Sequence, residues 1–493
     1  MQNSAQSVSG LTKALRYDLV GFDQSIKRIS VATTIRNESR DCLALVAGVY
    51  GVEASAVISV LSLYRMADKP DIWSFCSRLD GKIFLFATFF FICMSALTSW
   101  KYYALRVRSG HPFGAIIKWN IVPVILIIMI AEVMLRVVST ETQLGTVVGG
   151  QLLLPRRFEG AVSRHTQQTI EATQHDEFLG WTLKPNVSSK DGLYFISAQG
   201  FRSPRPDMGF DKSNSGCRIA LVGDSHTFGS ELKFENTWAH YLGKHIPSEC
   251  QVLNFGVGGY SLGQIYLRYL RDVRSWRPDV VVLALSSGSA QRTMGVYGLN
   301  MFPLTVPWAQ PRFQVKDREL VLINMPLPKP ETLASATSMS DLPFLEYDWN
   351  YLPSMWALPQ WHYLYYSYLF RLYTTWFPIW RHEMRGGSEE SVNHELLRSF
   401  LSTAESDGAA AVVMYLPDKT DFEEPFPKET SSRRILRTSG IDYVDLVPCL
   451  DKVPASDRFI PHGDHYSLSG SIAIAQCVAD QIPHTPARLA VSR

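Results

Sequence analysis

Gly223, Asp224 and Ser225 form the first group in the sequence whose residue types could do chemistry. They follow a short apolar run, 219–222, and precede a polar segment typical of a helix start. A serine at this place is presented at the carboxyl end of a strand, where open α/β sheets bind their ligands. The tripeptide therefore predicts a nucleophilic serine. The alternative is an ordinary strand-to-helix turn in which Asp224 or Ser225 caps the helix.

Two further segments could complete such a site. A serine hydroxyl is a weak nucleophile until a base removes its proton, and an imidazole oriented by a carboxylate is the usual base. The segment 462–470 offers histidines and an aspartate ahead of an apolar, helix-like stretch. The glycine-rich segment 254–261 follows an expected strand, and its backbone amides could bind an oxyanion. The three segments together predict an acyl-transfer site.

The elements around these segments alternate between strand and helix. Continuous apolar runs predict strands, and apolar residues at helical spacing predict helices. The expected strands are 219–222, 252–255, 280–285, 410–416 and 443–446, and the expected helices are 261–276, 396–404 and 469–482. This alternation predicts an α/β fold with a parallel sheet covered on both faces.

Two stretches do not follow this alternation. Residues 139–215 are polar and rich in turn residues, which predicts short strands joined by turns, above all within 175–202. Residues 291–393 form a long insertion rich in Trp, Tyr, Phe and Pro, in which 320–323 is expected to be a hairpin strand. A lid, a platform for sugar rings or a collar at a membrane interface would all use such aromatics. A separate small aromatic core is the alternative.

The motifs resemble those of the SGNH, or GDSL-type, hydrolase family. The resemblance covers about 218–482 apart from the insertion, and the segment before it resembles those of membrane-attached bacterial members. It implies a flavodoxin-like three-layer α/β/α domain over 216–486. It also implies that Ser225 is the nucleophile and that His465, five residues before a glycine, is the base. The backbone amides of Ser225 and Gly259 would then form the oxyanion hole.

Two positions depart from the family pattern. Family members usually carry an oxyanion-hole Asn where this chain has Ser289, so the Ser289 hydroxyl is expected to donate the hydrogen bond there. The family's acid precedes the histidine by two or three residues, where this chain has none. The adjacent Asp464 is therefore expected to orient His465, with a Ser/His dyad as the alternative. Two further histidines, His226 and His462, are expected to be polar lining of the site.

The N-terminal part contains three apolar runs that predict membrane-spanning helices, near 43–64, 83–100 and 119–138. The first carries Glu53 and two glycines, so an amphipathic or buried soluble helix stays open as an alternative there. The loop 101–118 has four basic and no acidic residues, which the positive-inside rule places in the cytoplasm. Residues 1–42 are then expected to be cytoplasmic, and the chain beyond 138 extracytoplasmic.

The cysteines and the composition narrow the chemistry further. Cys217 and Cys250 stand just before two strands that are expected to be neighbours, which predicts a disulfide bond. For Cys449 and Cys477, a disulfide and two buried free thiols both stay open. No metal is expected because CxxC and His/Cys ligand spacings are absent, and no cofactor because Ser261 replaces the third glycine of a dinucleotide fingerprint. A net charge of +2 argues against a general nucleic-acid binder.

These observations predict a membrane-anchored, extracytoplasmic serine esterase or O-acyltransferase that works through an acyl-Ser225 intermediate. The resemblance alone suggests the O-acyl groups, above all O-acetyl groups, of cell-surface polysaccharide as substrate, and the periplasmic side of the inner membrane as location. The expected partners are the lipid bilayer and this ester-bearing substrate, and the sequence indicates no oligomeric state. A catalytically weakened protein of the same fold that binds surface glycans is the alternative, because the oxyanion Asn is missing.

Overall fold

The computed structural model describes residues 128–167, 172–210, 212, 216–301, 308–376, 387–422 and 429–482. The chain divides into two compact units. The large unit comprises residues 139–366 and 378–493, and it contains all the motifs expected to do chemistry. The small unit comprises residues 1–138 and 367–377.

The described part of the small unit contains two helices. One covers residues 128–138, and the other is α11 (Tyr368–Trp376). The Glu132 carboxylate pairs with Arg136 at 2.8 Å and accepts the backbone N–H groups of Tyr368 and Leu369 at 2.8 and 3.0 Å. The predicted spans 43–64 and 83–100 lie outside the described residues, as does the first part of the span 119–138. Within the described ranges, no helix has both the length and the apolar character that a membrane crossing requires.

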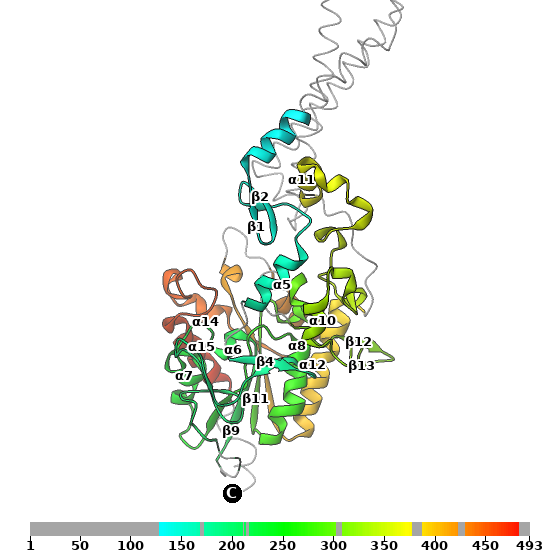
Figure 1. Cartoon of the computed structure of the whole chain (residues 1–493). Coiled ribbons are helices and arrows are strands. Elements are labelled where there is room, and N and C mark those ends of the chain that lie inside the picture. Colours follow the sequence, from blue (N-terminus) through cyan, green and yellow to red (C-terminus); the bar gives the residue numbers. More distant parts are fainter. Residues whose placement is uncertain are drawn as a thin grey trace, which may run out of the picture. The chain divides into compact units, whose positions relative to one another are not determined.

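An eight-stranded sheet forms the centre of the large unit (Figure 1). Its parallel strands are β9 (Arg218–Gly223), β10 (Gln251–Asn254), β11 (Val280–Ser286), β14 (Ala410–Leu416) and β15 (Val444–Asp445). They lie in the order β10-β9-β11-β14-β15, which is the flavodoxin-like order 2-1-3-4-5. The predicted α/β fold with a parallel sheet is therefore confirmed.

The polar stretch ahead of β9 extends this sheet. β8 (Arg202–Ser203) pairs antiparallel with β10, and β7 (Phe195–Ile196) and β6 (Val187–Ser188) continue outward from it. A separate hairpin joins β4 (Thr173–Asp176) to β5 (Gly180–Leu183). The expected short strands are present, and those of β6 to β8 belong to the same sheet as the parallel strands.

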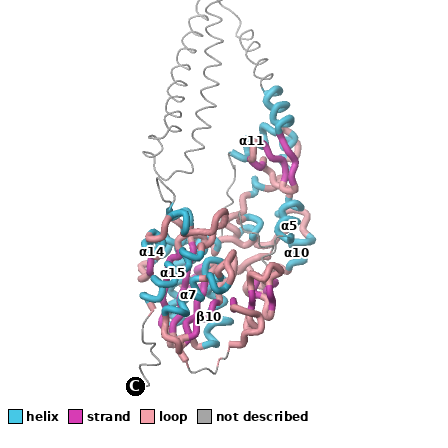
Figure 2. Tube along the Cα trace, turned by 90° about the vertical axis from the view of Figure 1, so that its left-hand side faces the viewer, coloured by secondary structure: helices cyan, strands magenta, loops and turns pink. Residues whose placement is uncertain are grey.

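Helices cover both faces of the sheet, because successive side chains of each strand point to opposite faces. In β11, Val280 and Val282 face one core, whereas Val281 and Leu283 face the other. α7 (Trp238–His245) and α15 (Leu468–Gln481) contribute to the first core and lie side by side (Figures 1 and 2). The second core receives residues from α8 (Leu262–Arg268), α12 (Glu389–Ser406) and α13 (Ser431–Ser439).

Two disulfide bonds tie elements of the large unit together. Cys217 and Cys250, which directly precede β9 and β10, are bonded as expected from their places before neighbouring strands. Cys449 and Cys477 are also bonded, and they join α14 (Val447–Asp451) to α15. The second bond settles the choice that the sequence left open, in favour of the disulfide.

The insertion between β11 and α12 has an apolar core of its own. This core includes Leu342, Tyr351 and Trp356, and Phe158 of α5 (Phe158–Gln167) packs edge-on against Trp356 with ring centroids 5.9 Å apart. The expected hairpin strand near 320–323 is β13 (Glu319–Leu322), which pairs with β12 (Phe313–Lys316). Part of the aromatic content of the insertion is therefore structural.

Candidate active site

Ser225 stands where the central strand of the sheet ends. β9 lies between β10 and β11 and ends at Gly223, and Ser225 begins the four-residue helix α6 (Ser225–Phe228). The Asp224 carboxylate caps this helix by accepting the His226 N–H at 3.0 Å. A side chain at Gly223 would come within 2.7 Å of the Ala284 carbonyl oxygen, so a glycine is needed at this turn. Ser225 is half-buried and lines a cavity of about 850 Å³ at the carboxyl edge of the sheet.

His465 lines the same cavity, on the short connection that leads into α15. Its carbonyl accepts the Ile460 N–H at 2.9 Å, and Ser467 caps the helix that follows. The His465 Nδ1 atom lies 2.8 Å from a carboxylate oxygen of Glu231. The tautomer in which Nδ1 donates to this carboxylate leaves Nε2 without a proton, the form that a general base requires. The structure thus brings Ser225 and His465 to one cavity.

The carboxylate at His465 is not the one expected from the sequence. Asp464 has an 86% exposed side chain, and its carboxylate lies 4.0 Å from Lys419 Nζ. The Asp464 carboxylate makes no hydrogen bond to His465 among the described residues, and the carboxylate at the His465 Nδ1 atom is that of Glu231. The expectation that Asp464 orients His465 is therefore corrected: Glu231, six residues after Ser225, holds that place.

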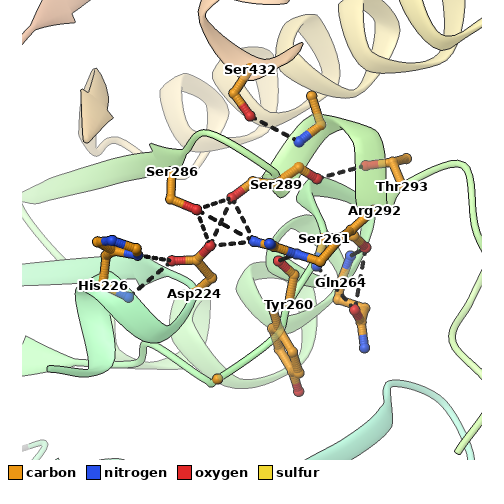
Figure 3. A network of polar contacts seen from close by, with 12 residues as sticks. Asp224, His226, Tyr260, Ser261, Gln264, Ser286, Ser289, Arg292, Thr293 and Ser432 are labelled. Atoms are coloured by element: carbon orange, nitrogen blue, oxygen red, sulfur yellow. Dashed lines mark hydrogen bonds and ion pairs between the residues drawn. The ribbon is translucent and has the colours of Figure 1, made fainter. Parts of the chain in front are cut away.

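A buried polar network surrounds Asp224 (Figure 3). The carboxylate is 1% exposed, and it accepts hydrogen bonds from Ser286 and Ser289 and forms an ion pair with Arg292. Burial alone would raise the pKa of Asp224, but the charge of Arg292 and the hydrogen bonds lower this pKa on balance. Asp224 is thus a charged residue that supports α6 from below the cavity surface.

Ser289 belongs to this network and not to the cavity lining. Its side chain is fully buried on α9 (Ser289–Arg292), where its hydroxyl lies 3.0 Å from Asp224 and 3.2 Å from Ser286. The sequence predicted that the Ser289 hydroxyl donates to an oxyanion. In the structure it donates to Asp224 instead. Arg292, one helical turn later, does line the cavity, and its Nε donates to the Tyr260 carbonyl at 3.1 Å.

The glycine loop lies directly against α6. The Asn254 side chain donates to the Thr227 carbonyl at 2.8 Å and accepts the Gly256 N–H at 3.0 Å. A Cβ atom at Gly256 would come within 2.5 Å of the Phe228 backbone nitrogen, so the close approach requires glycine. Gly259 adopts a positive φ of 78° and lines the cavity with Ser225. Neither the Ser225 nor the Gly259 N–H has a hydrogen-bond acceptor within the described part of the chain.

The two additional histidines lie in different places. His226 lines the cavity and is 9% exposed, and its ring packs tilted against that of His465 and edge-on against that of Tyr466, at centroid distances of 4.9 and 5.2 Å. Burial, aided by the neighbouring His465, lowers the pKa of His226 to about 4, so its ring is neutral at pH 7. His462 lines a separate, smaller hollow. The expectation of a polar lining role at the main cavity therefore holds for the position of His226 and not for that of His462.

The insertion supplies one wall of the cavity. Besides Arg292, its contributions are a tryptophan, amide side chains and apolar side chains: Gln291, Asn300, Met301, Trp349, Asn350, Leu352 and Met355. The remaining charged residues at the cavity are Asp464 and, on the connection after β14, Asp418 and Lys419. No cluster of three or more potential metal-ligating side chains exists among the described residues.

Glu231 and Arg292 are the site residues that the sequence did not reveal. Glu231 contacts a histidine 234 positions away, a separation that no local motif records. Arg292 lies four residues after Gly288, on a helix within the segment where an Asn was sought. The sequence signal for Arg292 was a charged residue shortly after the end of an expected strand. No sequence signal pointed to Glu231.

No family model and no curated protein match the chain. Solved structures that resemble it include a protein from Desulfitobacterium hafniense DCB-2 assigned to the lipolytic proteins of the G-D-S-L family, at 14% identity and a TM-score of 0.27, covering 54% of this chain and 99% of that one. A lipase/acylhydrolase from Enterococcus faecalis has 13% identity and a TM-score of 0.28, covering 54% and 95%. A catalytic mutant of an acetylxylan esterase from Geobacillus stearothermophilus has 14% identity and a TM-score of 0.29, covering 55% and 96%. These TM-scores are too low to decide fold or function, which rest on the topology and the site.

Proposed function

We propose that the chain is a membrane-anchored, extracytoplasmic serine esterase or O-acyltransferase of the SGNH type. The observation that carries this proposal is the presence, in one cavity, of Ser225 on the turn after the central strand and of His465 with its Nδ1 held by a carboxylate. A serine that lines a cavity together with an oriented imidazole is the arrangement that nucleophilic acyl transfer requires.

The reaction would proceed in two halves. His465 Nε2 removes the proton from the Ser225 hydroxyl as its oxygen attacks the ester carbonyl, and the N–H groups of Ser225 and Gly259 stabilise the resulting oxyanion. Collapse of the tetrahedral intermediate breaks the bond to the alcohol, which leaves with the proton from His465. The acyl group is then on Ser225. A water molecule or an acceptor hydroxyl attacks it next, and His465 again serves as base and then as acid.

The substrate class is part of the proposal. Aromatic and amide side chains at the cavity, such as Trp349 and Asn350, are of the kinds that stack on and hydrogen-bond to sugar rings. They support an O-acylated, above all O-acetylated, cell-surface polysaccharide as substrate. The membrane anchor rests on the apolar runs of the sequence, and the two disulfide bonds favour an oxidising compartment such as the periplasm.

Labelling with a fluorophosphonate tests the proposed function. The full-length protein, in detergent or in isolated membranes, should be labelled covalently, and Ser225→Ala should abolish the labelling. Ser230→Ala is the matched control, since Ser230 also lines the cavity and its replacement should leave Ser225 labelled. A wild-type protein that folds and takes up no label at Ser225 would contradict the enzyme and favour the glycan-binding alternative.

A further inference from the structure

Glu231, shortly after α6, lies next to His465, shortly before α15, although the two residues are far apart in the sequence. The Glu231 carboxylate lies 2.8 Å from His465 Nδ1, with side chains 43% and 20% exposed, respectively. We propose that Glu231 is the positioning residue of the site: it fixes the tautomer and orientation of His465, in place of an acid next to the histidine in sequence. This inference rests on the proposed function.

The backbone holds Glu231 at this place. The residue follows the left-handed end of α6 and itself has a positive φ of 66°, a conformation that is uncommon for a non-glycine residue. Its N–H donates to the Tyr194 hydroxyl at 2.9 Å. The Tyr194 ring in turn packs against the Arg202 guanidinium, 4.5 Å from its centroid, and edge-on against Phe228, 5.1 Å away. The carboxylate is therefore aimed at His465 by a packed set of contacts.

Gly463 shows that the space beside His465 is already occupied. A Cβ atom built at this position, two residues before the histidine, would lie 2.6 Å from a Glu231 carboxylate oxygen and 3.1 Å from its Cδ. The backbone there is not in the left-handed region that favours glycine, so the Glu231 carboxylate is the group that a side chain at this position would meet. The Glu231 carboxylate thus occupies the volume that an acidic side chain at position 463 would take.

The other acidic groups around the cavity have different partners. Asp224 is bound to Arg292 and two serines, and its oxygen faces His226. Asp418 accepts the N–H and the hydroxyl of Thr420. Asp464 faces Lys419. Glu231 is consequently the carboxylate whose contact can select the tautomer of His465.

The test compares five variants of the full-length protein, one of which, Asp464→Asn, removes the charge of the acid that the sequence predicted for this role. Glu231→Gln keeps the size of the side chain and removes its charge, whereas Glu231→Ala removes the contact. The double variant Glu231→Ala/Gly463→Asp places a carboxylate in the vacated space from the other chain segment. Glu235→Gln is the matched control. Glu235 lies four residues after Glu231, is exposed and is not part of the cavity lining.

Two measurements are made on each variant: the rate of fluorophosphonate labelling at Ser225, and the NMR signal of the His465 ring Nδ1–H in protein labelled at its histidines. Glu231→Gln and Glu231→Ala should label about 100-fold more slowly or worse, since losing the correct tautomer costs about 10⁴-fold in the template triad. Both should also lose the hydrogen-bonded Nδ1–H signal. The double variant should recover the signal and at least about tenfold of the lost rate, an outcome that a merely structural role of Glu231 would not give.

Several results would overturn the inference. One is a Glu231→Gln protein that labels like Glu235→Gln and retains the Nδ1–H signal. Another is that Asp464→Asn, and not Glu231→Gln, slows labelling and removes the signal.

If the wild type takes up no label, the proposed function fails, yet the Nδ1–H signal still decides whether Glu231 holds His465. If the double variant fails to fold, Glu231→Gln still decides the question through both measurements.

Discussion

The Asp224 carboxylate and the Arg292 guanidinium form an ion pair next to Ser225, with Asp224 1% exposed and Arg292 at the cavity surface. Their positions in the sequence are 68 residues apart. The pair joins the end of β9 to α9, so it connects the turn that carries the nucleophile to the segment after the neighbouring strand. The buried carboxylate depends on this cation because burial disfavours its charged form.

Removing the cation should therefore destabilise the fold. We expect Arg292→Met to lower the free energy of unfolding by about 3 kcal/mol, since it leaves a buried charge unpaired. Asp224→Asn keeps the helix cap and removes the charge, so the double variant should lose at least about 1 kcal/mol less than the sum of the single variants. Denaturant unfolding measures these values. Arg398→Met breaks an exposed pair with Glu395 and should change stability by less than about 0.5 kcal/mol. Additive losses at Arg292 and Asp224 would contradict the coupling.

Gly256 should tolerate no side chain. In Gly256→Ala the methyl group would meet the Phe228 nitrogen at 2.5 Å and the Thr227 carbonyl carbon at 2.8 Å, both backbone atoms that cannot rotate away. We expect a loss of about 1–3 kcal/mol in stability from this overpacking, together with slower labelling of Ser225 as α6 is displaced.

Gly243→Ala is the control for Gly256→Ala. Gly243 lies inside α7, and its added methyl group would find Val252 no closer than 3.9 Å. Replacing a helical glycine by alanine where there is room for the methyl group should raise the free energy of unfolding by about 0.5–1 kcal/mol. Thermal unfolding followed by circular dichroism distinguishes the two. Equal effects of both substitutions would show that the loop does not press against α6.

His226 should make stability depend on pH. Its pKa of about 4 in the folded protein is below the unfolded value of about 6.5, so the unfolded chain binds the proton more readily. The contribution of His226 to the free energy of unfolding is therefore fully present above pH 6.5, and up to about 3 kcal/mol of it is lost as the pH falls toward 4. Both ring nitrogens lack hydrogen-bond partners in the described structure, so His226→Phe keeps the ring packing and removes the titration.

The measurement for His226 is the difference in unfolding free energy between His226→Phe and wild type at pH 7.5 and 4.5. The variant should gain relative stability at the lower pH. Other groups, such as Asp421, whose pKa burial raises to about 6, titrate in both proteins and cancel in the difference. A difference that is the same at both pH values would show that His226 binds its proton equally well in both states.

The sequence predicted those parts of the fold that local patterns determine. β14 has the expected bounds, 410–416, because a strand that is covered on both faces coincides with a continuous apolar run in the sequence. α12 begins earlier than expected, at Glu389, since Ser388 caps it and two glutamates fill its first turn. The expected helix 261–276 changes to π and 3₁₀ turns after Arg268, which helical spacing alone does not reveal.

For the site, local motifs predicted the positions of Ser225, Gly259 and His465, all of which line one cavity. They did not predict which acid faces His465, because Glu231 reaches it only through the topology of the sheet. Nor did they predict that Ser289 turns toward Asp224. That direction depends on a buried charge whose partner, Arg292, lies on the same short helix.

The cavity has two origins in the chain. Its reacting groups stand at the ends of sheet strands and at the start of α15, whereas Trp349, Asn350 and their neighbours come from an insertion with a separate core. The residues that form this separate core, such as Leu342, Tyr351 and Trp356, do not contact Ser225 or His465, whereas Arg292 and Phe313 of the same insertion belong to the site and to the core of the sheet. Substitutions confined to Trp349, Asn350 and their neighbours should therefore change selectivity for the alcohol portion of a substrate while leaving Ser225, His465 and the Asp224–Arg292 pair in place.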